Sequence, residues 1–271
     1  MSDHPAVADG ATLGLREIAR WGAYFPVVLH RVSAGTPHAT ADVPEGESVA
    51  TILSPQALAA RIEATLTGVT AGRDPAQIAQ IPRRVGASVA HLGLMSRLVS
   101  GRIGAAALGV LLPMRLEHDR LIPTGRGGST LSVALPDGAP EVTRLAPTWI
   151  DLAQEVRDRW VRDLVADVAE PVRAAFGAVT GVPPTIATGN LVSSIHGGLA
   201  AVAWTRGGGR ADPRHEACVA DLLGRPEFAS AWRGRLGVGT DGPFRRASCC
   251  LLYRVAAPGE PAPMCGDCIL R

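Results

Sequence analysis

The sequence contains no lysine, so all 27 of its basic side chains are arginine. These arginines are spread along the chain and the formal net charge is only +2. The chain therefore lacks the basic surface that attracts nucleic acid or an acidic membrane. Without lysine, the glycine-rich run 125–130 also cannot match the phosphate-binding G-x-x-x-x-G-K-[ST] loop. We expect no nucleic-acid partner.

A secretory leader and a long apolar run are also missing. The first thirty residues have no basic region followed by an apolar one, which is the pattern of a signal peptide. The most apolar stretch, Val85 to Leu112, is interrupted by His91, Arg97 and Arg102, whereas a membrane span needs about 18 apolar residues in a row. We therefore expect a cytoplasmic protein without a membrane span. Its five cysteines should then be reduced rather than paired in disulfides.

The composition is that of an ordinary globular protein, with 46% hydrophobic and 19% charged residues. Ser54 followed by Pro55 predicts a helix start, because serine caps and proline fits the first turn. Apolar residues at helical spacing predict further helices, and Pro113 is expected to end the second of them. The predicted helices cover 54–66, 83–112 (one kinked helix or two), 149–179, 186–204, 214–223 and 226–232.

Strand patterns are few. Leu131 to Pro136 alternates apolar and polar residues, and the turn signal Asp137-Gly138 predicts that 141–145 pairs back as a second strand. A short strand-like run also occurs at 251–255. The expected fold is α+β and predominantly helical, with a small antiparallel β element. We expect a mainly helical body over 1–240 and a loop-rich cysteine segment over 241–271.

Four of the five cysteines lie within the last 23 residues, as the adjacent pair Cys249-Cys250 and the C-x-x-C pair Cys265 and Cys268. A C-x-x-C pair is a common metal-binding turn, and Gly266 gives that turn backbone freedom. Adjacent cysteines in an extended chain point to opposite sides. Two such thiolates suit the two irons of a [2Fe-2S] cluster better than one tetrahedral zinc. A four-thiolate zinc site and a redox-active dithiol stay open as alternatives.

The run from Arg245 to Arg254, RRASCCLLYR, followed by Cys-Gly-Asp-Cys at 265–268, resembles the C-terminal signature of FhuF-like ferric-siderophore reductases. The sequence Gly189-Asn190 is similar to the opening of a helix in that family. This resemblance implies that Cys249, Cys250, Cys265 and Cys268 ligate a [2Fe-2S] cluster through which catalysis occurs. The fourteen-residue spacer 251–264 is longer than is usual in the family, and a longer loop closes at little entropic cost.

The resemblance also implies an oxidoreductase that reduces siderophore-bound Fe(III) to Fe(II) by one electron and so releases the iron. The implied partners are a ferric siderophore, of hydroxamate type, and an electron donor such as a ferredoxin or a flavin reductase. The sequence has no flavin or nicotinamide fingerprint of its own. An iron–sulfur electron carrier or sensor without turnover, and a binding protein stabilised by zinc, are the alternative functions.

Two further expectations concern residues near or apart from these ligands. Arg245, Arg246 and Arg254 flank the cysteines, where positive charge would offset an anionic thiolate centre, or they are ordinary solvated side chains. Cys218 lies among apolar residues of a predicted helix and is expected to pack in the core.

Overall fold

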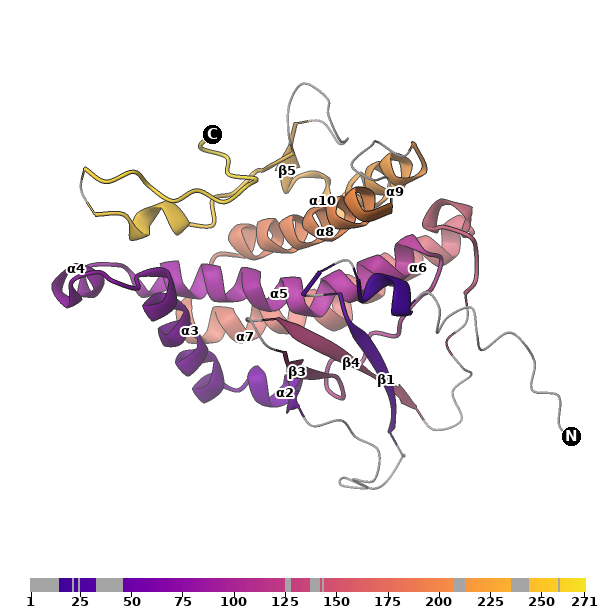
Figure 1. Ribbon diagram of the computed structural model, residues 1–271, viewed down its shortest axis with the longest axis horizontal. Coiled ribbons are helices and arrows are strands. Elements are labelled where there is room, and N and C mark those ends of the chain that lie inside the picture. Colours follow the sequence, from indigo (N-terminus) through magenta and orange to yellow (C-terminus); the bar gives the residue numbers. More distant parts are fainter. Residues whose placement is uncertain are drawn as a thin grey trace, which may run out of the picture.

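The computed structural model describes residues 15–20, 22–23, 25–32, 46–124, 128–136, 142, 144–206, 213–234, 244–257 and 259–271. The fold is α+β and predominantly helical, as the sequence predicted. Helices α5 and α8 lie one above the other in Figure 1, with the sheet below α5 and the C-terminal segment, in yellow, above α8. Residues 244–257 and 259–271 form the cysteine segment.

Helix α5 (Arg83–Ala107) is the centre of the core. It is one continuous helix, and eighteen of its residues are buried. It ends before Gly109, which has φ +71° and lies so close to the Ala146 carbonyl that a Cβ would be 1.9 Å from the oxygen. The prediction that Pro113 ends this helix is therefore wrong. The chain turns earlier, at a left-handed glycine that closes the helix.

A four-stranded mixed sheet packs against α5, in the order β1-β4-β3-β2. Its strands are β1 (Val27–Val32), β2 (Glu47–Ser48), β3 (Arg120–Pro123) and β4 (Ser129–Pro136). β1 runs parallel to β4, whereas β3 is antiparallel to β4 and β2 is antiparallel to β3. Strand β4 confirms the predicted strand at 131–136. Its predicted hairpin partner is wrong, because Arg144 forms a bridge with Val110 instead, and Asp137-Gly138 lies outside the described residues.

A buried ion pair joins α5 to this sheet. The Arg102 guanidinium bonds to the Asp119 carboxylate, and both side chains are fully buried. The second Asp119 oxygen accepts the backbone N–H of Ala134 in β4, at 3.2 Å. Arg102 also donates to the carbonyl oxygen of Leu98 at 2.9 Å. These bonds satisfy both buried charges, which would otherwise be strongly destabilising.

Helix α3 (Pro55–Val69) packs against α5, with the short helices α2 (Val49–Ile52) before it and α4 (Pro75–Ala79) after it in the chain. The predicted start of α3 is confirmed, because the Ser54 hydroxyl accepts the Ala57 N–H at 3.3 Å and caps the helix. Leu58, Ile62 and Leu66, spaced four residues apart, form the buried face of this helix.

The predicted helix at 149–179 is interrupted. It consists of a 3₁₀ turn η2 (Trp149–Asp151), α6 (Gln154–Asp163), a π-helical turn η3 (Leu164–Ala169) and α7 (Glu170–Thr180). Pro171 lacks the N–H that would bond four residues back, so the preceding turn widens. Leu152, Trp160, Leu164 and Val168 are buried, whereas Val156, at the same helical spacing, is 37% exposed.

The last helices are α8 (Pro184–Arg206), α9 (Pro213–Leu223) and α10 (Pro226–Ala229). Strands β5 (Trp232–Arg233) and β6 (Arg245–Arg246) then pair antiparallel. The strand-like run at 251–255 is instead a 3₁₀ turn, η4 (Leu252–Val255). The preceding Leu251 has φ 66°, in the left-handed region, so the chain cannot continue as a strand.

By length and composition, one helix in the described part of the chain could cross a membrane. It is the Pro184–Ala203 portion of α8, and 61% of that window is buried inside the protein. The core helix of a folded protein meets the same criteria. The absence of a membrane span therefore stays a prediction.

Candidate metal centre

The first cysteine pair follows directly on a segment that is fixed to the body. The Ala247 N–H donates to the Ala231 carbonyl oxygen at 2.8 Å. The Ser248 hydroxyl donates to the Thr185 carbonyl oxygen, in the first turn of α8, at 2.9 Å. The backbone directly before Cys249 and Cys250 is therefore bonded to the body of the protein at two points, Ala231 and Thr185.

The second cysteine pair forms a tight turn against the first. The Cys268 N–H donates to the Cys265 carbonyl oxygen at 3.3 Å, which closes the C-x-x-C turn. The Arg246 N–H donates to the Asp267 carbonyl oxygen at 3.1 Å. Residues at the tip of the turn are thus bonded to the strand that precedes Cys249 and Cys250.

One sulfur from each pair is brought into contact. The Sγ atoms of Cys250 and Cys265 are 3.5 Å apart, and all five cysteines of the protein are free. Two thiolates on one tetrahedral metal, each about 2.3 Å from it, lie about 3.8 Å from each other. The contact is a hydrogen bond between the two thiol groups, and its length is somewhat below this ligand spacing.

The other two sulfurs lie outside this contact. In the part of the chain that the structure describes, no group of three or more His, Cys, Asp or Glu side chains is arranged to hold a metal ion. Cys249 and Cys268 each accept a backbone N–H from two residues further on, Leu251 at 3.3 Å and Leu270 at 3.4 Å. Such N–H···S bonds stabilise thiolates and are typical of the surroundings of metal-bound sulfurs.

Arg246 is the charged side chain that reaches the sulfur pair from inside the protein. It is only 1% exposed. Its Nη2 donates to Cys265 Sγ at 2.7 Å, and its Nη1 donates to Asn190 Oδ1 at 2.7 Å. Its Nε lies 3.2 Å from a carboxylate oxygen of Asp267, a distance for ion pairing but without the angle of a hydrogen bond.

Asn190 connects this arginine to both long helices. It lies in α8, it is fully buried, and its Nδ2 donates to the Ser88 carbonyl oxygen of α5 at 3.0 Å. Because Oδ1 accepts from Arg246 and Nδ2 donates to α5, the orientation of the amide is fixed. The chain of bonds runs from α5 through Asn190 and Arg246 to Cys265.

The electrostatics of the site favour a thiolate. The hydrogen bond with Cys265 is the main cause that lowers the pKa of Cys250 to about 5, and the positive charge of Arg246 acts in the same direction. The pKa of Cys265 is raised, mainly because that residue then holds the proton of the shared hydrogen bond. Burial raises the pKa of Cys249. A metal ion that replaces these protons would find one thiolate already formed.

The remaining predictions concern Cys218 and the three arginines that flank the cysteines. Cys218 is buried in the core, as expected, and burial raises its pKa to about 12, which makes it an unreactive thiol. Of the three flanking arginines, Arg246 alone is buried at the sulfurs. Arg245 donates to the Gly266 carbonyl oxygen at 3.4 Å, and Arg254 is exposed and contacts Tyr253.

Sequence reasoning did not assign roles to Asn190, Asp267 and Gly189. The buried Gly189 lies against Ser248, where a Cβ would be 2.1 Å from the hydroxyl oxygen. In the sequence, Gly189-Asn190 indicates only a helix opening similar to that of the FhuF-like family. Neighbouring glycine and asparagine within an apolar helix are the available signal, because each is unfavourable there without a specific partner.

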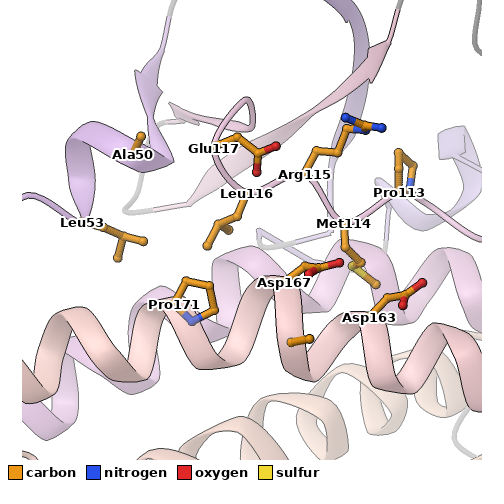
Figure 2. A pocket seen from close by; sticks show the side chains of 11 residues that line it. Ala50, Leu53, Pro113, Met114, Arg115, Leu116, Glu117, Asp163, Asp167 and Pro171 are labelled. Carbon is orange, nitrogen blue, oxygen red and sulfur yellow. The ribbon is translucent and has the colours of Figure 1, made fainter.

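A separate cleft of about 720 Å³ opens between α2, the loop after α5 and the π-helical turn η3. In Figure 2 the acidic side chains of Glu117, Asp163 and Asp167 border it beside an apolar wall that includes Leu53 and Met114. The volume is within the range of small-molecule sites. None of the described residues that line it is a cysteine, so the cleft is distinct from the metal centre.

Comparison of the chain with protein-family models finds no matching family. Comparison with curated proteins finds no match either.

Proposed function

We propose that this protein is a ferric-siderophore reductase in which Cys249, Cys250, Cys265 and Cys268 hold a [2Fe-2S] cluster. The observation that carries the proposal is the 3.5 Å contact between Cys250 Sγ and Cys265 Sγ beneath the buried Arg246 guanidinium. It joins one member of each cysteine pair at a distance somewhat below the spacing of shared metal ligands. The likeness of the C-terminal signature to FhuF-like reductases supports the substrate class.

The residues present fit such a cluster in their chemistry. A [2Fe-2S] cluster takes four thiolates, two for each iron. Cys250 and Cys265 would hold one iron, which leaves Cys249 and Cys268 for the other. The two sulfurs of this second pair already accept backbone N–H bonds from Leu251 and Leu270. Hydrogen bonds to sulfur are among the factors that set the potential of such clusters.

The proposed reaction transfers one electron to Fe(III) in the siderophore and needs no acid, base or nucleophile. When bound, the cluster supplies this one-electron chemistry. Fe(II) has a lower charge and is softer than Fe(III), so the oxygen ligands of the chelate bind it less tightly and the iron is released. The chain's own part is to hold the four thiolates, to offset their charge with Arg246, and to keep Cys250 and Cys268 out of water.

The electron comes from a partner protein in this proposal. A ferredoxin or a flavin reductase would deliver one electron for each Fe(III) that is reduced. The substrate is a ferric siderophore, of hydroxamate type, and the reaction takes place in the cytoplasm. Neither step requires a nucleic acid or a membrane span.

Anaerobic purification followed by optical and EPR spectra tests the cofactor. We expect a red-brown protein with about two irons per chain and an EPR signal after reduction. Cys250→Ser should alter or abolish both spectra. Cys218→Ser is the matched control and should leave them unchanged, because that thiol is in the core. A colourless protein with one zinc per chain would instead establish the zinc site.

Turnover is tested separately with the reduced protein. Mixing with a ferric trihydroxamate chelate should reoxidise it rapidly and release Fe(II), which a ferrous chelator such as ferrozine detects. A protein that carries the cluster but is not reoxidised by the chelate is not a reductase. That result would leave the iron–sulfur electron carrier or sensor as the function.

A further inference from the structure

The charge at the sulfur pair is unevenly distributed. Arg246 donates to Cys265 Sγ at 2.7 Å, and its positive charge also acts on the adjoining Cys250 sulfur. On the other side, Cys249 and Cys268 accept neutral backbone N–H groups. A buried positive charge therefore bonds directly to one of these pairs of sulfurs, whereas the exposed Arg254 acts on Cys249 through its charge alone.

Several contacts fix the position of the Arg246 guanidinium. It is 1% exposed, and besides the sulfur it bonds to Asn190 Oδ1 at 2.7 Å. Asn190 is held in turn by the Ser88 carbonyl oxygen. Arginines that neutralise charge at a protein surface are solvated and mobile. The buried Asn190 amide instead holds the Arg246 guanidinium in one position.

Asp267 opposes the arginine at the same place. One of its carboxylate oxygens lies 3.2 Å from Arg246 Nε, and its side chain is 14% exposed. This oxygen makes no hydrogen bond with any described residue. The carboxylate sits between Cys265 and Cys268 in the sequence, so its negative charge partly cancels that of Arg246 at the thiolates.

We propose that Arg246 is a positioning residue that raises the reduction potential of the centre, that Asn190 aims it, and that Asp267 acts in the opposite direction. This inference rests on the proposed iron–sulfur cluster. The reduced centre carries one more negative charge than the oxidised centre, so a nearby guanidinium stabilises the reduced form and a nearby carboxylate destabilises it. The electron should accordingly reside on the Cys250 and Cys265 side.

Redox titration of the purified holoprotein, followed by optical absorption and EPR, tests the inference without any turnover. We expect Arg246→Leu to reduce the equilibrium constant for one-electron reduction at least tenfold, which is 59 mV for a one-electron couple. Asp267→Asn should increase it. Arg246→Lys keeps the charge and should restore part of the loss, whereas Asn190→Ala should give a smaller decrease than Arg246→Leu.

Arg144→Leu is the control, because Arg144 is an exposed arginine that bonds to the Ala146 carbonyl oxygen and lies in the loop before η2 rather than in the cysteine segment. It should leave the potential within a few-fold of the original equilibrium constant. A purely structural role for Arg246 predicts lower stability with an unchanged potential. If Arg246→Leu does not retain the cluster, the other two variants still test the inference. The reduction potential should rise in Asp267→Asn and fall in Asn190→Ala, and shifts in the opposite directions would overturn it.

Different results would overturn the proposed function and the inference about Arg246. A purified protein without any iron–sulfur cluster overturns both the proposed function and this inference. A cluster whose potential is the same in Arg246→Leu, Asp267→Asn and the unmodified protein overturns the inference alone.

Discussion

Replacing Gly189 with alanine tests how closely α8 and the cysteine segment approach each other. The new methyl carbon would lie 2.1 Å from Ser248 Oγ, well inside the contact distance of any two atoms. Ser248 immediately precedes Cys249, and its hydroxyl bonds to the Thr185 carbonyl oxygen at 2.9 Å. The hydroxyl must therefore move, and it cannot do so and keep this bond.

The magnitude follows from two opposing effects. Alanine is favoured over glycine in a helix interior by about 1 kcal/mol. Overpacking a close contact costs about 1–3 kcal/mol, and losing the Ser248 hydrogen bond costs about 1 kcal/mol more. We therefore expect Gly189→Ala to lower the free energy of unfolding by about 1–3 kcal/mol.

The control lies in the same helix. Gly197 is exposed, and a Cβ there would meet nothing within 4 Å, so Gly197→Ala should raise the free energy of unfolding by up to about 1 kcal/mol. Removing the hydroxyl as well, in Gly189→Ala with Ser248→Ala, leaves the Ser248 Cβ at an ordinary 3.5 Å. The double variant should therefore be more stable than Gly189→Ala alone.

Equilibrium unfolding in urea under reducing conditions measures these three variants and the single variant Ser248→Ala, and the midpoint shift at constant slope gives the difference in stability. Equal stability changes for alanine at Gly189 and at Gly197 would refute the close approach. So would a double variant whose loss is the simple sum of the two single losses, because residues in contact should couple.

Three further predictions concern the body and the turn after the cysteine pair. Asp119→Ala removes one partner of the buried ion pair with Arg102 and should lower the free energy of unfolding, measured in urea, by about 3–5 kcal/mol. Glu63→Ala breaks a pair with Arg83 whose side chains are 48% and 61% exposed, so it should lower that free energy by less than about 1 kcal/mol. Similar losses in the two variants would contradict the role of the buried pair. Burial lowers the pKa of His91 from 6.5 to about 4, so the folded protein keeps this ring neutral while the unfolded chain takes up a proton first. The His91 contribution is thus complete above pH 6.5 and is lost as the pH falls toward 4, by up to about 3 kcal/mol; unfolding curves of the unmodified protein and His91→Phe that stay parallel over this range would exclude it. Leu251→Val should lower the melting temperature more than Leu251→Gly, because the φ of 66° is worst for a β-branched residue and free for glycine; better tolerance of valine would show that this conformation is not retained.

The local features of the fold could be predicted from the sequence. The Ser54 cap, the apolar face of α3 and the extent of α8 follow from residue types and spacing within one element. The errors occur where a contact with a distant segment decides. Helix α5 stops at Gly109 because the chain near Ala146 lies against it, and no pattern within the helix reveals that contact.

The candidate site shows the same division. Its cysteines could be picked out because their clustering is a local feature. The partners of Arg246 could not, because Asn190 lies 56 residues away in the sequence and Ser88 is further still. The turn at Leu251 also escaped prediction, since leucine rarely adopts a left-handed conformation and nothing in its side chain indicates one.

The bonds from Ser88 through Asn190 to Arg246 make the cysteine segment a poor candidate for transfer to another scaffold. Its sulfur ligands would travel with a grafted peptide, but the amide that aims the guanidinium belongs to α8 and the carbonyl that aims the amide belongs to α5. In a grafted peptide, Arg246 would lack its hydrogen-bond partner Asn190 and would not be held against the sulfurs. During divergence, substitutions at Asn190 and Arg246, whose side chains bond to each other, should accordingly be accepted together rather than one at a time, whereas position 88 contributes only a backbone carbonyl and is free to vary.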